Sequence, residues 1–438
     1  MTQDLHQGRR AIRGRVLTFV DDPATVGEAA SHHYHEDGIV VVENGRIVAR
    51  GDSASVLPTL AAETVIDDYS GCFVVPGFID THIHYPQSGI VASFGTQLLE
   101  WLEKYTFPEE QRFADRGYAE RTAKYFLDEL LRNGTTTAAV YCTVHEQSAE
   151  AFFTESQRRN TRMIAGKVMM DRNAPEALRD DATQSYEASR RLLRKWHGNG
   201  RQLYAVTPRF ALTSTPEQLE AAGSLIREFP DCYLQTHLSE NRDEVAAAAN
   251  MYPDAANYTD IYDRAGLLGS RSIFGHGIHL DGTELRRLHD TRSVIAFCPS
   301  SNLFMGSGLF DLAKTTTGER PVRVGLASDI GAGTSFSMLR TAHDAYKVLQ
   351  LLGQNLTALR AIYTITLGNA RALSLDHLIG SLEPGFEADI AVVDPTAMPA
   401  LRHRVDTIEG DMAAELFATI TLGDDRCVRA TYVAGEPV

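Results

Sequence analysis

VVPGFIDTHIH, residues 74–84, is the stretch that decides the fold of this chain. An apolar, β-rich run ends here in two histidines, His82 and His84, two positions apart. Side chains alternate along a strand, so two residues at this spacing point to the same face. The two imidazoles can therefore hold one metal ion, or they can be two hydrogen-bonded histidines of an ordinary strand. The neighbouring segments must decide between these interpretations.

The same pattern, a short apolar or β-rich run followed by a helical stretch, recurs through the middle of the chain. The further runs are TTTAAVYCTVH (135–145), RMIAGKVMMD (162–171), LYAVTPRFAL (203–212), CYLQTHLSE (232–240), SIFGHGIHL (272–280), SVIAFCPSSN (293–302) and RVGLASDIGAG (323–333). Eight such units over about 300 residues predict an α/β fold, a (β/α)8 TIM-like barrel. A doubly wound sheet is the alternative, but no GxGxxG motif follows the first strand. The long connection 85–134 is expected to shape or cover a pocket.

Both ends of the chain are typical of β-structure. DGIVVVENGRIVARGD (37–52) joins two β-branched runs through Asn44-Gly45, a favoured pair for a type I′ hairpin turn. The C-terminal segments ADIAVVDP and CVRATYVAGEPV indicate short strands. We therefore expect a small β-sandwich domain formed by both termini, residues 1–73 and 379–438, attached to a barrel of residues 74–378. The HHYH at 32–35 is interpreted as a surface loop between strands.

Composition excludes several classes of partner. The net charge of −15 disfavours nucleic acid and anionic membranes, which both need basic patches. Five isolated cysteines without a CxxC pair predict a reducing, cytoplasmic environment. The polar N-terminus shows no signal-peptide pattern, and the apolar runs are too short to span a bilayer.

Further metal-binding residue types lie at other predicted strand ends, where barrel enzymes keep their chemistry. The fifth run ends in His237, followed by Glu240, and the eighth ends in Asp329. Alone, each could be a core histidine, a solvated glutamate or a turn aspartate. Together with His82 and His84 they suit Zn²⁺, or Fe²⁺ with similar geometry. A catalytic ion of this kind lowers the pKa of a bound water to near 7.

Four other titratable side chains can be assigned a catalytic or a structural role. Glu240 is the best-placed group to carry protons, because it lies beside His237 and has no ligand duty. His276, at the sixth strand end, is expected to polarise substrate or orient the nucleophile, whereas His279 lies further out and is interpreted as a loop residue. Lys167 lies within the third run, so we interpret it as structural and predict a single metal ion.

The combination of PGFIDTHIH with His237, His276 and Asp329, in that order, resembles the amidohydrolase superfamily. The resemblance covers nearly the whole chain and implies a metal-dependent hydrolase with the barrel and the terminal β-domain described above. The segments that are similar to its guanine-deaminating members are DTHIHYPQ, LLEWLEKYTFP, GKVMMDRNAP, TPRFALTS, THLSENRDE and SDIGAGTSFSML.

That resemblance implies hydrolysis of guanine to xanthine and ammonia by a hydroxide that one zinc ion per subunit activates, in a homodimer. The implied metal ligands are His82, His84, His237 and Asp329. The implied catalytic residues are Glu240, Asp329 and His276. The implied substrate contacts are Gln87, Arg209, Phe210, His84 and His237. The chemistry agrees, because a purine carbonyl needs an arginine or amide donor and its ring needs an aromatic face.

Two alternatives remain open. The same scaffold could act on another purine, a pyrimidine or a chlorotriazine, with the metal and Glu240 retained. A non-catalytic assembly protein could keep the barrel, although such a protein is expected to lack ligands that are present here. Asn302 and Asp171 also stand at predicted strand ends, where we expect them to support the site from behind.

Overall fold

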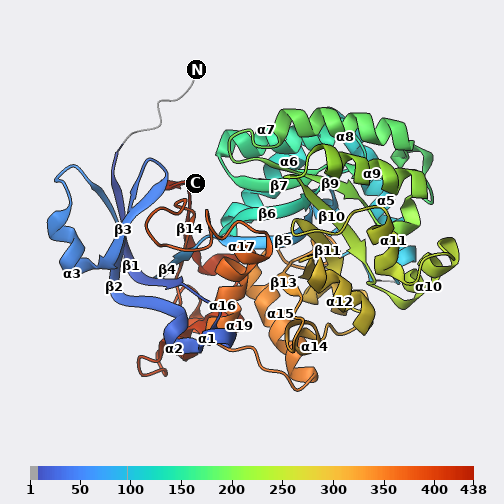
Figure 1. Cartoon of the computed structure of the whole chain (residues 1–438). Helices are drawn as coiled ribbons and strands as arrows, with labels where there is room; N and C mark the ends of the chain where they lie inside the picture. The colour runs from blue at the N-terminus through green and yellow to red at the C-terminus, as the bar shows by residue number, and fades with distance from the viewer. Residues whose placement is uncertain (1–7, 96) are drawn as a thin grey trace.

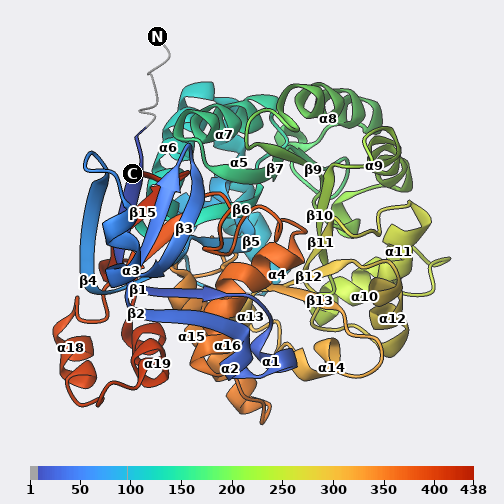
Figure 2. The ribbon, with the colours of Figure 1, turned by 60° about the vertical axis from the view of Figure 1, so that its left-hand side comes forward.

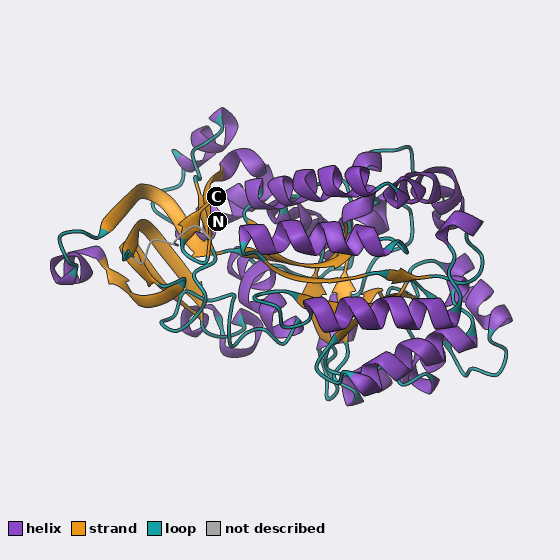
Figure 3. Ribbon diagram, turned by 90° about the horizontal axis from the view of Figure 1, so that it is seen from above, coloured by secondary structure: helices purple, strands orange, loops and turns teal. Residues whose placement is uncertain are grey.

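The computed structural model of the chain describes residues 8–95 and 97–438. Figure 1 shows a barrel ringed by helices, with a separate sheet at its side that contains both the N-terminal and the C-terminal strands. Seen from above, helices surround the barrel strands, and the terminal sheet extends away from them (Figure 3).

Parallel strands form the barrel, and their spatial order follows the sequence. They are β5 (Phe78–His84), β6 (Thr135–Tyr141), β7 (Arg162–Gly166), β9 (Leu203–Pro208), β10 (Tyr233–Leu238), β11 (Ser272–His276), β12 (Val294–Phe297) and β13 (Arg323–Leu326), with the short β8 (Val168–Met169) beside β9. Each β-rich run proposed from the sequence contains one of these strands. The (β/α)8 expectation is confirmed.

The barrel closes where β5 and β13 end. The Asp329 amide donates to the carbonyl of His82 at 3.0 Å, and the His84 amide donates to the carbonyl of Ile330 at 2.8 Å. These two hydrogen bonds place the end of β5 and the segment after β13 side by side. Three of the predicted metal ligands are therefore brought together by closure itself.

Helices cover the outside of the barrel because each has one apolar stripe. In α8, the buried Ala188, Leu192 and Trp196 recur every four residues, and Asp181 caps the first turn through the amide of Gln184. The larger helices are α6 (Arg116–Arg132), α7 (Glu146–Arg159), α8 (Ala182–Trp196), α9 (Pro216–Glu228), α10 (Arg242–Met251), α11 (Tyr258–Arg264), α12 (Gly282–Asp290), α13 (Pro299–Phe304), α15 (Met338–Leu351) and α16 (Ala358–Tyr363). None of the described helices is long and apolar enough to cross a membrane.

The long connection after β5 lies over the carboxyl ends of the strands. It contains the turn η2 (Tyr85–Ile90), α4 (Leu98–Trp101), the π-helical turn η3 (Leu102–Thr106) and α5 (Phe107–Gln111) before α6 begins. Leu98, Trp101 and Leu102 are buried and line the same cavity as the barrel histidines. As expected from its length, this connection helps to build a pocket.

The terminal sheet joins both ends of the chain, and Figure 2 shows the red C-terminal strand β15 among the blue N-terminal strands. The antiparallel pairing of β4 with β14 connects the two parts. In the described residues its order is β16 (Glu436–Pro437), β15 (Val428–Val433), β14 (Ile390–Val393), β4 (Val65–Pro76), β1 (Arg10–Phe19), β2 (His32–Glu43) and β3 (Arg46–Asp52). Asn44 and Gly45 connect β2 to β3 with positive φ angles of 53° and 75°, as a type I′ turn requires. Helices α18 (Pro399–Val405) and α19 (Met412–Leu422) lie between β14 and β15, an insertion that the sequence pattern did not indicate. The proposed division at residues 73 and 378 stays a prediction.

Two local expectations were wrong. The stretch 74–84 is two strands, because Pro76 has no amide hydrogen to continue β4 and the barrel strand begins only at Phe78. The histidines at 32–35 belong to β2 rather than to a loop. They pair with the apolar end of β1, for example His35 with Val16 and His32 with Phe19, so the strand continues beyond the run of valines.

Candidate active site

Four predicted metal ligands meet at the carboxyl ends of the barrel strands. His82 and His84 project from β5, His237 from β10, and Asp329 follows β13. The Nε2 atoms of His82 and His84 lie 3.2 Å apart, as do those of His84 and His237. Oδ1 of Asp329 lies 3.3 Å from Nε2 of His82 and from Nε2 of His84. These donor atoms therefore face a common centre.

The spacing of these atoms fits one small cation. Donors bound tetrahedrally at about 2.0–2.1 Å from a zinc ion lie about 3.3 Å from one another, which is the separation found here. The three histidines are also grouped as a buried set able to hold an ion. Unprotonated imidazole nitrogens facing each other at this distance would repel without a cation between them. The donor set therefore fits a metal such as Zn²⁺ or Fe²⁺.

The protonation states suit metal binding, which requires neutral histidines and an ionised carboxylate. Burial lowers the pKa of His84 to about 3, and the neighbouring Asp329 only partly opposes this effect. Burial, together with His82 and His84, lowers the pKa of His237 well below its ordinary value. Burial alone would raise the pKa of Asp329, but hydrogen bonds with His82 and His84 outweigh it and hold that pKa well below its ordinary value.

Neighbouring groups orient two of the ligands. Nδ1 of His237 donates to the main-chain carbonyl of Arg209 at 2.7 Å, which leaves Nε2 with a free lone pair. Behind β5, the buried Asp80 accepts hydrogen bonds from the amides of His82 and Ser328, at 3.2 and 3.1 Å. Asp80 thus connects the strand that holds the histidines to the segment that holds Asp329.

The backbone is strained at His276, where β11 ends, and at Asp329, which follows β13. His276 and Asp329 have φ angles of 70° and 53°, a left-handed conformation that L-residues with side chains seldom adopt. Such strain costs on the order of 1–3 kcal/mol per residue and tends to persist at functional sites. In both cases the side chain is buried at the centre of the site.

Glu240 and His276 stand beside the metal-donor set. Nε2 of His276 lies 3.4 Å from Oε2 of Glu240 and 3.8 Å from Oδ2 of Asp329. Ser307 donates to Oε1 of Glu240 at 3.1 Å. Burial, and then the charge of Asp329, raise the pKa of Glu240 to about 8. A carboxyl group with this pKa carries a proton at neutral pH and can donate it.

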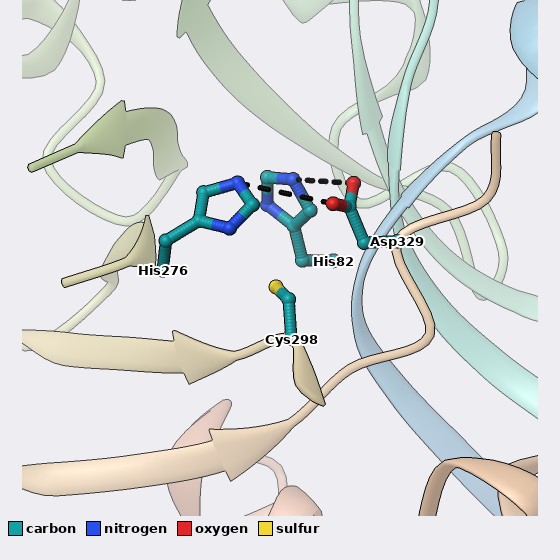
Figure 4. Close-up of side chains that lie close together, drawn as sticks. All are labelled: His82, His276, Cys298 and Asp329. Atoms are coloured by element: carbon teal, nitrogen blue, oxygen red, sulfur yellow. Dashed lines mark ion pairs between the residues drawn. The ribbon is translucent and has the colours of Figure 1, made fainter. Parts of the chain in front are cut away.

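The other nitrogen of His276 has a fixed partner. Nδ1 of His276 lies 2.9 Å from Oδ1 of Asn302 and donates to it, since an amide oxygen can only accept. Figure 4 shows the His276 and His82 rings next to each other, both joined by dashed lines to the Asp329 carboxylate, with the sulfur of Cys298 directed toward the rings. Asn302 therefore has the supporting position expected of it.

One cavity contains nearly all of the predicted site residues. It is lined by His84, Gln87, Leu98, Trp101, Leu102, Arg209, Phe210, His237, Glu240, His276, Asp329 and Ala332. His82 lies behind this lining and is fully buried. The pocket joins a metal-donor set and a protonated glutamic acid to an arginine, an amide and an aromatic ring, which suits a planar substrate with a carbonyl.

Three residues from the sequence analysis lie elsewhere. Nε2 of His279 contacts the carbonyl of Ser307 at 2.9 Å and is outside the lining of the cavity. Asp171 accepts from the amide of Thr215 at 2.8 Å and so supports a neighbouring loop, not the ligands. Lys167 is buried between β7 and β8, pairs with Asp180 and donates to the carbonyl of Val168 at 3.1 Å, as a structural lysine would.

Two buried groups at the site were not among the residues predicted from the sequence. Cys298 has its sulfur within 4.8 Å of donor atoms of His82, His276 and Asp329, and burial raises its pKa well above the ordinary thiol value. Glu110, in the long connection, contacts both Arg209 and Gln87. Cys298 could have been found from its position at the seventh strand end. No local pattern marks Glu110.

Comparison with known proteins gives consistent matches. The profile described as "Amidohydrolase family" matches residues 73–438. The chain is 48% identical over 432 residues to the guanine deaminase of Escherichia coli (strain K12), covering 98% of this chain and 97% of that protein. The solved structure "E. coli Guanine Deaminase" superposes with a TM-score of 0.95 over 98% of this chain and 99% of that one. A guanine deaminase from C. acetobutylicum with bound guanine in the active site superposes with a TM-score of 0.85 at 25% identity, covering 98% and 100%.

Proposed function

The chain belongs to the amidohydrolase family, and we infer that it hydrolyses guanine to xanthine and ammonia. One observation carries this inference: the metal donors and Glu240 face the same cavity as Arg209, Gln87 and Phe210. The similarity to guanine deaminases over nearly the whole chain supports guanine as the aminopurine.

The proposed metal ligands are His82, His84, His237 and Asp329. A zinc ion bound there, or Fe²⁺ with similar geometry, would lower the pKa of a coordinated water to near 7 and so supply hydroxide at neutral pH. Asp329 is ionised, and its Oδ2 lies 3.8 Å from Nε2 of His276. This oxygen can accept a proton from the attacking water.

The substrate is held by groups on two segments of the chain, the turn η2 and the residues that follow β9. Arg209 donates to the purine carbonyl, Gln87 binds the neighbouring ring edge, and Phe210 packs against the ring face. Held in this way, the purine presents C2 to the space between Glu240 and His276. Fixing the reacting atoms in one orientation removes a large part of the entropic barrier.

Protons then move through Glu240. Its neutral carboxyl group donates to N3 of the purine as hydroxide adds to C2, so a C–O bond forms and negative charge does not build up on the ring. His276 stabilises the charge that develops at the tetrahedral carbon. The proton that Asp329 took from the water passes to the exocyclic nitrogen, so the C–N bond breaks and ammonia leaves. The C2 hydroxyl gives its proton to the ionised Glu240 as the carbonyl forms, which leaves xanthine and restores the neutral carboxyl group.

Replacement of Glu240 by glutamine tests this assignment. We expect kcat for guanine to fall by about 10²–10⁴, the usual contribution of a general acid, with metal content and melting temperature unchanged. A folded, metal-loaded Glu240→Gln protein that turns over guanine at the normal rate would contradict the assignment. Adenine, cytosine and a chlorotriazine serve as comparison substrates. Adenine and the chlorotriazine lack the carbonyl for which the site is built, and cytosine, which has a carbonyl, lacks the fused purine ring.

Three further properties are part of the proposal. We expect one zinc ion per subunit, a homodimer and a cytoplasmic location. The acidic net charge of −15 disfavours a nucleic-acid partner and does not oppose the entry of a small neutral substrate. Metal analysis and light scattering of the purified protein measure the first two properties.

A further inference from the structure

A buried carboxylate stands behind the two side chains that we assign to the purine edge. Glu110, in α5, is 1% exposed. Its Oε1 accepts from Nη1 of Arg209 at 2.8 Å and from Nε2 of Gln87 at 3.1 Å. Its Oε2 accepts from the same Nη1 at 2.9 Å. Glu110 itself does not line the cavity, whereas Arg209 and Gln87 do.

This contact determines which way the Gln87 amide faces. An ionised carboxylate has only acceptors, so Gln87 must turn its NH₂ group toward Glu110. The Gln87 oxygen then points the other way, 3.4 Å from the amide of Gly331. A glutamine amide can otherwise rotate and exchange its donor for its acceptor. Glu110 therefore makes the oxygen of Gln87 available as an acceptor at the pocket.

The same carboxylate leaves part of Arg209 available. A guanidinium has five N–H donors in a planar fork, and the carboxylate occupies Nη1 alone. Within the described residues, Nε and Nη2 of Arg209 have no hydrogen-bond partner among protein side chains or carbonyls. The pair is also neutral as a whole, which suits an uncharged substrate in a buried pocket.

We propose that Glu110 is a positioning residue that sets the preference of this pocket for a lactam edge, a ring carbonyl beside a ring N–H. The donors of Arg209 match the carbonyl, and the oxygen of Gln87 matches the N–H. The amidine edge of adenine or of 2,6-diaminopurine has the reverse pattern, an amino donor beside a ring acceptor. A rotated Gln87 could donate to that ring acceptor, and Glu110 prevents the rotation, while the donors of Arg209 still face the amino group. This proposal rests on the proposed function, because it describes how the same pocket selects its purine.

The test compares lactam with amidine ligands in Glu110→Gln. The glutamine keeps the shape but can turn a donor toward Gln87 and Arg209, so it no longer imposes one orientation. We expect kcat/KM for guanine to fall by about 10–100-fold, mainly through KM, and the preference for guanine over 2,6-diaminopurine to fall at least about tenfold. The equilibrium preference for hypoxanthine over adenine should fall in parallel, and this measurement needs no turnover.

Glu109→Gln is the matched control. Glu109 is the preceding residue of the same helix, is also buried, and pairs with Arg112 at 2.9 Å and with Tyr118, away from the pocket. We expect this variant to keep the wild-type preference. Glu110→Asp keeps the buried charge if the glutamine variant fails to fold, but its shorter side chain cannot reach both partners, so it should lose part of the preference.

The outcomes separate this proposal from the proposed function. A wild-type protein that releases no ammonia from guanine overturns the proposed function. A wild-type protein that does release ammonia, while Glu110→Gln or the folded Glu110→Asp keeps the full preference for hypoxanthine over adenine, overturns the role of Glu110. An equal loss of preference in Glu109→Gln also overturns it, because the effect would then belong to the helix and not to the contact.

Discussion

Glu244 offers a way to disturb Glu240 without touching it. Glu244 lies in the first turn of α10 and is buried. Its Oε2 accepts from the amides of Glu240 and Asn241, at 2.7 and 3.0 Å, and its Oε1 accepts from the Tyr258 hydroxyl at 2.7 Å. Glu244 therefore holds the main chain of the proposed proton carrier in place.

The change Glu244→Ala removes both carboxylate oxygens and the three hydrogen bonds that they accept. Two buried amides then lose their partner, at about 1–3 kcal/mol each if water does not replace it, and the helix loses half of a capping box. We expect the free energy of unfolding to fall by about 2–4 kcal/mol. Displacement of Glu240 by about 1 Å can cost on the order of 10² in rate, so we expect kcat/KM for guanine to fall about 10–100-fold.

Glu284→Ala is a matched control for stability. Glu284 makes the same kind of capping box on α12, where it accepts from the amide of Asp281 at 2.9 Å and from the amide and hydroxyl of Thr259 at 3.1 and 3.0 Å. Its contacts do not include a proposed catalytic residue. Urea unfolding should show similar losses of stability in both variants, whereas kcat/KM should fall only in Glu244→Ala.

Two results would refute this reasoning. One is a Glu244→Ala protein that is destabilised as expected but keeps kcat/KM within about twofold of the wild type. The other is an equal loss of kcat/KM in Glu284→Ala. Either result would mean that the position of Glu240 does not depend on Glu244.

The remaining predictions concern an ion cluster and two pocket residues. Glu387 accepts from Nε of Arg162 at 2.8 Å and from Nη2 of Arg201 at 2.7 Å. The change Glu387→Gln should lower the free energy of unfolding by about 3–5 kcal/mol, measured by urea unfolding at pH 7. Burial raises the pKa of Glu387, but the two arginines outweigh it and lower that pKa below 4.5, so its stabilisation is present above pH 4.5 and is lost as the pH falls further. Asn302→Leu leaves Nδ1 of His276 without an acceptor and should lower kcat/KM about 10–100-fold with metal content unchanged. Phe210→Ala should raise KM about tenfold with a smaller change in kcat, because it removes ring packing against the substrate.

Each of these has a result that would contradict it. Glu387→Gln should be less sensitive than the wild type to acid below pH 4.5, and equal sensitivity would mean that the cluster does not govern acid stability. Loss of metal in Asn302→Leu would show that Asn302 supports the ligands and not His276. A fall in kcat alone for Phe210→Ala would place that ring in the chemical step.

The barrel and the cluster of proposed metal ligands could be predicted from the sequence because both depend on short-range patterns. A strand end is visible as an apolar run that stops, and His82, His84, His237 and Asp329 each stand at such a stop. The same reasoning separated the structural Lys167 from the ligands, since it falls inside a run. The β5 boundary was less visible, because Pro76 and Gly77 interrupt a run that is apolar on both sides.

Apart from that of Asn302, the supporting contacts could not be predicted from the sequence because they connect distant segments. Glu110 reaches Arg209 across 99 positions in the chain, and nothing in its neighbours distinguishes it from Glu109. The strained φ of His276 has no sequence signal either, since the residue is neither glycine nor asparagine. Such contacts depend on the fold, so they could be identified only from the structure.

The most direct test of the central claim is ammonia release from guanine, measured together with metal content in one sample of purified protein. The account predicts ammonia and xanthine in equal amounts, with a rate that rises in proportion to bound zinc or iron up to one ion per chain and that disappears after chelation. Ammonia release by metal-free protein would contradict it. So would a protein with one ion per chain that leaves guanine unchanged.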